Sequence, residues 1–163
     1  MDERRQRLLA AIDGAFCGVE LGDGVSLHET VVIDGYGGFE KQQAARIPDE
    51  KKDWRKLIGD PELVRINGVG GLSFFDTAGL RFHLPAYLSL AVIDFDRQDA
   101  REVLESLMFH LTNLSDYNLS RFSVLDDTQR QCVRDVLSFL RDEYELEDVE
   151  LDQAIAGFWA PAV

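Results

Sequence analysis

Residues 72–93 read LSFFDTAGLRFHLPAYLSLAVI and form the most apolar run of the chain. Apolar residues in this run fall at positions i, i+4, i+7, i+8 and i+11, which is the spacing of one helix face. They are Leu80, Leu84, Tyr87, Leu88 and Ala91. From Leu84 onward apolar side chains surround the helical wheel almost completely, and a helix of that kind is normally enclosed by others. We therefore expect a buried helix at the centre of the core.

Local chemistry marks the start of this helix and a break within it. Asp76 is the expected N-cap. Pro85 should kink the helix or begin a second one, because proline lacks an amide hydrogen and its ring clashes with the carbonyl four residues earlier. An alternative places a β-hairpin over residues 72–84, with a turn at 76–79. That alternative would make the fold α+β.

Helical spacing recurs on both sides of the central run. A capping box at Ser26 and Glu29 predicts a helix that extends to about Asp34, and a second box at Asp126 and Gln129 opens a longer helix. The other expected helices are at residues 3–16, around Trp54 with Asp49 as the cap, after Asp60-Pro61-Glu62, and at about 100–111 and 151–159. Residues 39–66 have the lowest hydrophobicity in the first half and should be a solvated face or lid. We predict an all-α fold, with residues 1–163 as a single-domain helical bundle around a central buried helix.

Composition bounds the possible partners. The 163 residues include 30 Asp and Glu against 17 Lys and Arg, a formal net charge of -13. This charge repels phosphate backbones, which argues against nucleic-acid binding, and it favours a basic protein partner. Charged residues and Pro85 interrupt the apolar run, so no membrane span is expected. The N-terminus lacks a signal-peptide pattern, so we expect a cytoplasmic protein that is a monomer or weak dimer.

The motif LSFFDTAGLRFHLPAYL at residues 72–88 resembles the signature of an uncharacterised bacterial family of small proteins, of the form LSFxDxxGxRFxLPAYL. The similarity extends more loosely to Asp49-Glu50 with Trp54, to residues 122–140 and to Phe158-Trp159. The resemblance implies a small helical bacterial protein without a known activity, and it supplies no catalytic residues. His83 stands where we would expect an aromatic such as tyrosine, which argues against a special role for this histidine.

Motifs for catalysis or metal binding are weak throughout. His28, His83 and His110 lack a second histidine three or four residues away, as a helical metal pair would need. Asp34, Asp76 and Glu50 could complete an oxygen-rich site with one of them. The glycines at 68–71 lack the lysine of a phosphate-binding loop, Cys17 and Cys132 lack CxxC spacing, and no serine lies in a GxSxG elbow. We expect no cofactor, no metal and no nucleophile.

Two pairs of residues allow both a structural and a functional interpretation. Asp76 and Arg81 are expected to form a helix cap and a salt bridge that ties the helix start to another segment. An arginine fork beside an acid could also bind a carboxylate or the backbone of a partner. Trp54 and Trp159 are either edges of the core or aromatic anchors of an interface. The candidate interaction surface comprises Asp34, Asp49, Glu50, Trp54, Asp76 and Arg81.

The favoured hypothesis is a non-catalytic interaction or regulatory protein, of the immunity type, that uses its acidic surface to bind a basic partner. The acids between Asp142 and Asp152 are the expected binding segment, because they repel one another and are hard to explain as stabilising. The alternative for this segment is that its acids are only a solvated surface. The alternative is a small enzyme or metal-binding protein that uses clustered acids and a histidine.

Overall fold

The computed structural model describes residues 1–162, which form nine α-helices, three short 3-10 helices and no strand. The α-helices are α1 (Glu3–Ala15), α2 (Leu27–Asp34), α3 (Phe39–Arg46), α4 (Glu62–Arg65), α5 (Thr77–Asp94), α6 (Arg101–Thr112), α7 (Asp116–Phe122), α8 (Asp127–Glu143) and α9 (Val149–Ala156). The 3-10 helices are η1 (Trp54–Leu57), η2 (Gly71–Ser73) and η3 (Gln98–Ala100). The predicted all-α fold is confirmed, and the hairpin alternative is wrong.

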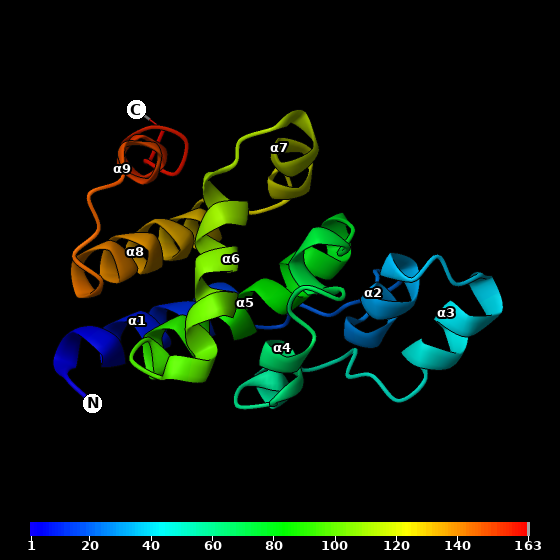
Figure 1. Cartoon of the computed structure of the whole chain (residues 1–163). Coiled ribbons are helices and arrows are strands. Elements are labelled where there is room, and N and C mark those ends of the chain that lie inside the picture. Colours follow the sequence, from blue (N-terminus) through cyan, green and yellow to red (C-terminus); the bar gives the residue numbers. More distant parts are fainter. Residues whose placement is uncertain (163) are drawn as a thin grey trace.

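The predicted central helix is α5, which lies in the middle of the molecule (Figure 1). Every side chain from Leu84 to Val92 is buried, as the all-round apolar pattern predicted. Pro85 lies inside this continuous helix and does not begin a second one. Burial on both sides of Pro85 offsets the one backbone hydrogen bond that proline cannot make. Among the described helices, none combines the length and apolar character needed to cross a membrane.

The other helices enclose α5. Helices α1 and α8 lie side by side and both pack against α5, while η1, α6 and α7 pack on it elsewhere (Figure 1). Helix α9 packs on α6 and α8. The buried side chains of these elements form one hydrophobic cluster that extends from Leu8 to Trp159. This cluster is the core that the central apolar run was expected to organise.

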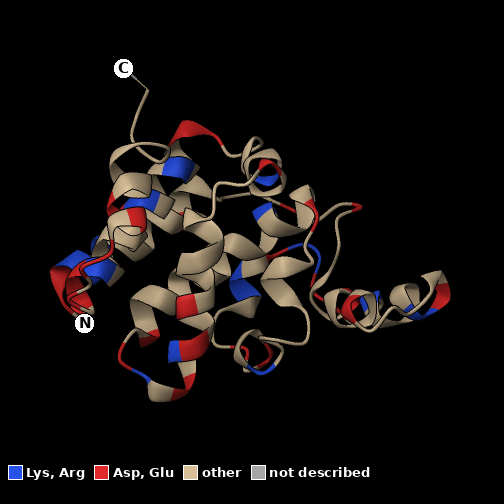
Figure 2. Ribbon diagram, turned by 45° about the horizontal axis from the view of Figure 1, so that its top comes forward, with Lys and Arg blue, Asp and Glu red and all other residues tan. Residues whose placement is uncertain are grey.

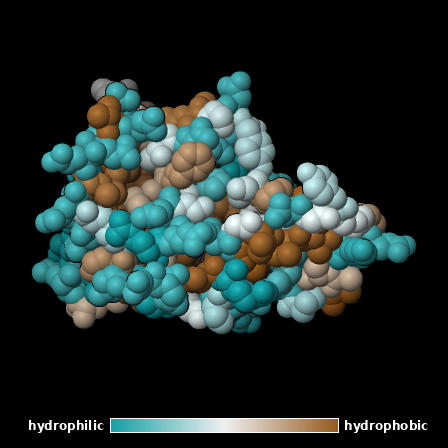
Figure 3. All heavy atoms as spheres, viewed as in Figure 1, coloured by the Kyte–Doolittle hydropathy of each residue, from teal (hydrophilic) through white to brown (hydrophobic). Residues whose placement is uncertain are grey.

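Helices α2 and α3 form an arm, residues 27–47, at one end of the molecule (Figure 1). Helix α3 has no buried residue and packs on α2. Phe39 and Ile47 are exposed, and Figure 3 shows hydrophobic atoms at this end of the surface. The turn between the helices places Tyr36, and not one of the adjacent glycines, at a positive φ of 58°, with its side chain 97% exposed.

Residues 39–66 differ from the predicted solvated face or lid. Helix α3 fits that expectation, but Trp54, Leu57, Leu63 and Ile66 are buried in the core. The many charged residues between these four lower the average hydrophobicity of the segment, so their burial was not predicted.

Two helix starts have the predicted capping boxes, and a third has a different cap from the one expected. The boxes at Ser26 with Glu29 and at Asp126 with Gln129 are both present. Asp49 does not cap the helix that contains Trp54, because Asp53 accepts the Arg55 N–H at 3.1 Å and caps η1 instead. Asp49 is thereby free to bind an earlier part of the chain.

Candidate functional site

The six residues predicted as an interaction surface are spread over several elements. Asp34 ends α2, Asp49 and Glu50 lie between α3 and η1, Trp54 begins η1, and Asp76 and Arg81 lie at and within α5. In residues 1–162, no hydrogen bond or ion pair joins any two of the six. They therefore do not form one site.

Asp49 fastens the start of α2 to the loop after α3. Its Oδ2 accepts from the Ser26 hydroxyl at 2.6 Å and from the His28 N–H at 2.7 Å, and its Oδ1 lies 2.5 Å from His28 Nδ1. The other ring nitrogen, Nε2, lies 3.4 Å from Glu62 Oε1 of α4. Partial burial acts to lower the pKa of His28, but the bonds and charges of Asp49 and Glu62 outweigh it and raise this pKa. His28 of α2 thus links the loop after α3 to α4, because one ring nitrogen contacts Asp49 and the other contacts Glu62.

Glu50 closes the loop that precedes η1. One of its oxygens, Oε2, accepts from the backbone N–H groups of Lys51, Lys52 and Asp53 at 3.1, 2.9 and 3.2 Å. The bond from Lys52 is the first cause of a pKa that lies below the usual value for glutamate. The Glu50 carboxylate therefore binds backbone N–H groups of its own loop.

Asp76 is the predicted cap of α5, but the predicted salt bridge between the helix start and another segment is absent from the described part of the chain. Asp76 Oδ1 accepts from the Gly79 N–H at 2.8 Å and from the Val25 N–H at 2.9 Å. Nε of the half-buried Arg81 has no hydrogen-bond partner among residues 1–162. Asp76 joins α5 to the segment before α2, because its second acceptor bond reaches across the fold.

Both tryptophans belong to the core. Trp54 and Trp159 are each 1% exposed. The indole N–H of Trp54 donates to Phe16 O at 2.9 Å, and that of Trp159 donates to Leu111 O at 2.8 Å. A partner therefore cannot use Trp54 as an anchor on this surface, and the interface interpretation of the pair is wrong.

A metal site built from the candidate acids is not formed. Among residues 1–162, no three or more His, Cys, Asp or Glu residues are placed to hold one ion. The oxygen-rich site considered for Asp34, Glu50 and Asp76 is therefore not supported by the geometry.

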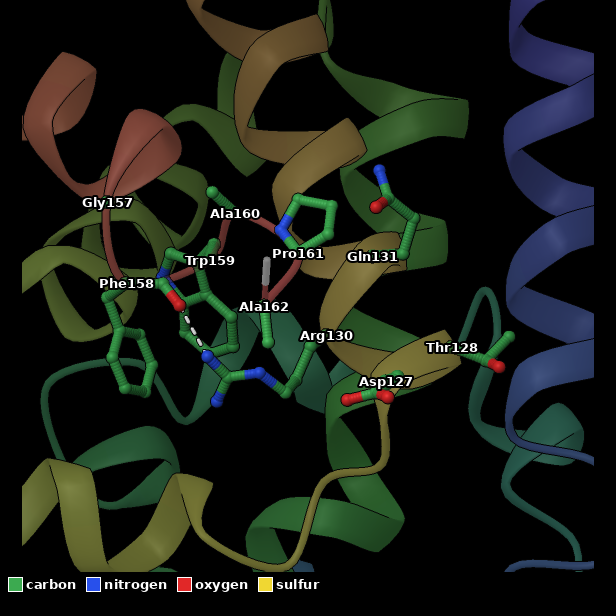
Figure 4. A pocket seen from close by; sticks show the side chains of 10 residues that line it. All are labelled: Asp127, Thr128, Arg130, Gln131, Gly157, Phe158, Trp159, Ala160, Pro161 and Ala162. Carbon is green, nitrogen blue, oxygen red and sulfur yellow. Dashed lines mark hydrogen bonds between the residues drawn. The ribbon is translucent and has the colours of Figure 1, made fainter.

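A cavity of about 710 Å³ lies between the start of α8 and the residues after α9 (Figure 4). Arg130 is the positively charged residue that lines this cavity. Its guanidinium carbon lies 4.3 Å from the ring centroid of Phe158 and 5.3 Å from that of Trp159. Arg130 also donates to the carbonyl of Phe158. The arginine holds the C-terminal residues on α8, and its charge is already matched to a carbonyl and two aromatic faces.

A smaller groove, of about 250 Å³, lies between α6 and α9, and we call it the α6–α9 groove. Apolar lining comes from Met108, Leu146 and Leu151, and acidic lining comes from Glu105, Asp148 and Glu150. Phe109 also lines this groove and is 61% exposed. The groove thus combines an apolar interior, an exposed aromatic ring and excess negative charge.

The acidic segment 142–152 borders this groove and divides into two sets of residues. Asp142 lies 2.9 Å from Arg4 and Asp152 lies 3.2 Å from Arg141, while Asp148 caps α9 through the Leu151 N–H at 3.0 Å. Glu143, Glu145, Glu147 and Glu150 have no ion pair within the described residues. Asp142, Asp148 and Asp152 are thus bound within the fold, whereas the four glutamates have no partner there. Figure 2 shows acidic and basic positions close together near the N-terminus, and Arg4 of α1 pairs there with Asp142.

Sequence reasoning missed Phe109, although one signal was present. The apolar stripe of α6 is Val103, Leu104, Leu107, Met108 and Leu111. Phe109 follows Met108 in the sequence but lies on the opposite, polar side of the helix, where a large aromatic residue breaks the polar pattern.

Comparison with known proteins identifies a family only. A protein-family model described as "Family of unknown function (DUF6714)" matches residues 4–163 of the sequence. No curated protein and no solved structure matches the chain.

Proposed function

The chain belongs to this family of unknown function, and we propose that it is an interaction or regulatory protein of the immunity type that binds a basic protein partner. The binding surface is the α6–α9 groove together with the acidic segment 142–152. The setting is the bacterial cytoplasm expected from the sequence.

The observation that carries this proposal is the combination of apolar and acidic groups in one groove. Met108, Leu146 and Leu151 supply contact area for an apolar side chain, and Glu150 supplies charge for a neighbouring lysine or arginine. Arg101 lies at the same groove, but it is paired with Glu105 at 2.7 Å and stacks on Tyr144 at 3.7 Å from the ring centroid. The net charge that the lining presents is negative, and this complements a basic segment.

Three of the four unpaired glutamates extend the negative charge beyond the groove, and the fourth, Glu150, lines it. The four residues are exposed and lie between the end of α8 and the first turn of α9; they are Glu143, Glu145, Glu147 and Glu150. Carboxylates that lack a cation in the same chain attract a basic partner over a distance of about one Debye length, ~8 Å at physiological salt. We expect these residues to govern the rate of association more than the lifetime of the complex.

Phe109 is the expected anchor of the contact. Exposed aromatic residues that become buried on binding are over-represented among the few residues that carry most of the affinity. A groove of about 250 Å³ has room for one or two side chains of the partner beside this ring. The occupant is therefore a short segment in which an apolar side chain adjoins lysine or arginine.

The test uses a partner captured from the native cell at low salt, identified and purified, and measures association at several ionic strengths. Replacing Glu143, Glu147 and Glu150 with glutamine should slow association about tenfold at low salt and flatten its salt dependence. Phe109→Ala should weaken the equilibrium affinity about tenfold or more, which corresponds to ~1.4 kcal/mol. Neither change should lower thermal stability appreciably, because all four side chains are exposed.

Matched variants separate the groove from other surfaces. Asp23→Asn, Glu40→Gln and Asp127→Asn change the net charge by the same amount at exposed positions on other elements. Phe39→Ala removes an aromatic of similar exposure from the arm. A partner that is weakened by these control variants, and not by the groove variants, binds elsewhere and contradicts the proposal.

A further inference from the structure

A serine and a histidine that are 37 residues apart meet at the surface. Ser73 is exposed at the end of η2, and its Oγ lies 3.0 Å from Nε2 of His110 on α6. The other ring nitrogen of His110, Nδ1, lies 2.7 Å from the backbone carbonyl of Ser106. No sequence motif indicated this pair, because the two residues come together only through the packing of η2 on α6.

The carbonyl of Ser106 determines which nitrogen of His110 carries the proton. A carbonyl oxygen can only accept, so Nδ1–H donates to it and Nε2 of the neutral ring has a free lone pair. The hydroxyl of Ser73 therefore donates to Nε2. Burial lowers the pKa of His110; the bond to Ser106 opposes this, and the charge of Arg121 adds to it. The histidine is thus held as a neutral base oriented toward the serine oxygen.

The backbone that carries Ser73 is held rigidly from α7. Arg121 is 2% exposed and donates through Nη1 to Leu72 O at 2.7 Å and to Phe75 O at 3.0 Å. The Tyr117 hydroxyl donates to Ser73 O at 3.2 Å. These bonds restrict the peptide units on both sides of Ser73, which is the preorganisation that a nucleophile needs.

Ser73 also lines a cavity of about 420 Å³, next to Leu72, Phe74 and Phe109. Asn67 lines the same cavity, and its side-chain amide makes no hydrogen bond within residues 1–162. An amide of this kind is a suitable donor to a developing oxyanion. Glu102 and Glu105 lie on the cavity wall, and their charge disfavours anionic substrates such as phosphate esters.

We propose that Ser73 and His110 act as nucleophile and general base in the hydrolysis of uncharged or cationic carboxylic esters bound in this cavity. Ser73 Oγ forms a bond to the ester carbonyl carbon while its proton passes to His110 Nε2. The bond from that carbon to the alcohol oxygen then breaks, and the alcohol leaves with the proton. Water repeats the sequence, its proton passing to His110 and then to Ser73, so that the carboxylic acid is released and the enzyme is restored.

The pair is tested with a fluorophosphonate probe, which forms a covalent adduct with an activated serine as fluoride leaves, and with 4-nitrophenyl acetate as a neutral ester. The native protein should give one adduct, located on Ser73 by peptide mapping, and should hydrolyse the ester. Ser73→Ala should abolish both. His110→Gln can still hold the serine hydroxyl but cannot take its proton, and it should slow both reactions about 100-fold or more.

Three comparisons complete the design. Ser123→Ala removes another exposed hydroxyl, one bonded to the Ser120 carbonyl and not to a histidine, and it should change neither reaction. Asn67→Ala should slow ester hydrolysis about 100-fold, and an ester with a carboxylate in its acyl group should react more slowly than the acetate. Circular dichroism and thermal melting verify that each variant is folded.

The absence of an adduct on Ser73 in the native protein overturns the proposal, as does an equal rate of labelling in the native protein and His110→Gln. Hydrolysis that persists in Ser73→Ala overturns it as well. Ser73→Ala leaves the α6–α9 groove intact, so binding of the basic partner is expected to be unchanged, and the two proposals fail separately.

Discussion

At the scale of single residues, His83 is the least expected feature of α5. Its side chain is fully buried, and its ring stacks on Phe75 with centroids 4.1 Å apart and planes inclined by 16°. Nδ1–H donates to Gly79 O at 2.6 Å, whereas Nε2 has no partner in the part of the chain that is described. Burial lowers the pKa of His83 to about 4, against the opposing effects of Gly79, Asp49 and Asp76.

This burial predicts a pH dependence of stability. The folded pKa lies below the unfolded value near 6.5, so the unfolded state takes up the proton first and stability falls as the pH drops from 6.5 toward 4. Between pH 8 and pH 5 the native protein should lose about 2 kcal/mol more than His83→Phe, at roughly 1.4 kcal/mol per pH unit. Denaturant unfolding at several pH values measures this difference.

His28 has the opposite sign and must be separated from this effect. Its folded pKa is raised, so its contribution to stability is complete below pH 6.5 and is lost as the pH rises through the folded pKa. The contribution is common to the native protein and His83→Phe, and it cancels in the comparison. Stability curves that remain parallel from pH 8 to pH 5 would show that His83 is protonated equally well in the folded state.

At the scale of elements, α5 and α6 illustrate two uses of a helix. Helix α5 is enclosed on all sides, so each of its apolar residues contributes to the core. Helix α6 buries one stripe and leaves Phe109 and Glu105 exposed at the rim of the α6–α9 groove. The two helices differ because α6 has polar residues along one side, and that side must face water.

The central position of α5 predicts a large cost for truncating Leu88. Leu88 is 0% exposed, and Leu88→Ala should reduce the free energy of unfolding by about 2–5 kcal/mol, because a packed leucine site leaves a cavity that the surrounding helices fill only in part. Chemical denaturation measures the change. Leu114→Ala, at a position 37% exposed, is the matched control and should cost much less. Equal costs at the two positions would contradict the central placement of α5.

At the scale of the whole molecule, acidic residues outnumber the cations that could pair with them. The net charge is -13, and several cations are already paired within the fold, for example Arg4 with Asp142 and Arg7 with Glu3. Exposed ion pairs contribute little to stability, about 0–1 kcal/mol each. The acids without a cation therefore dominate the long-range field, and they repel one another in the folded state.

We expect sodium chloride to stabilise the protein, because screening weakens this net repulsion more than it weakens the exposed ion pairs. Thermal melting in a range from low salt to about 0.5 M should show a rise of about 2–4 °C, equivalent to ~1 kcal/mol for a chain of this length. The rise should be smaller when Glu143, Glu147 and Glu150 are glutamine. A melting temperature that falls with salt would mean that the ion pairs outweigh the repulsion.

The sequence by itself determined the features that depend on residues within about one helical turn of each other. The 3.6-residue spacing around Leu84 predicted the buried helix, and the caps at Asp76, Ser26 and Asp126 predicted where helices begin. These signals are local, because a cap and its amide lie three residues apart and a helix face repeats every turn.

Only the tertiary structure decided which distant residues meet. Asp49 fitted a local cap in the sequence, yet it binds Ser26 and His28, more than twenty residues earlier, because the loop after α3 folds back on α2. Ser73 and His110 lie on separate elements, and no spacing rule relates them. The energy of such a bond depends on the positions of both partners, and the path of the chain between them is set by the burial of the core as a whole.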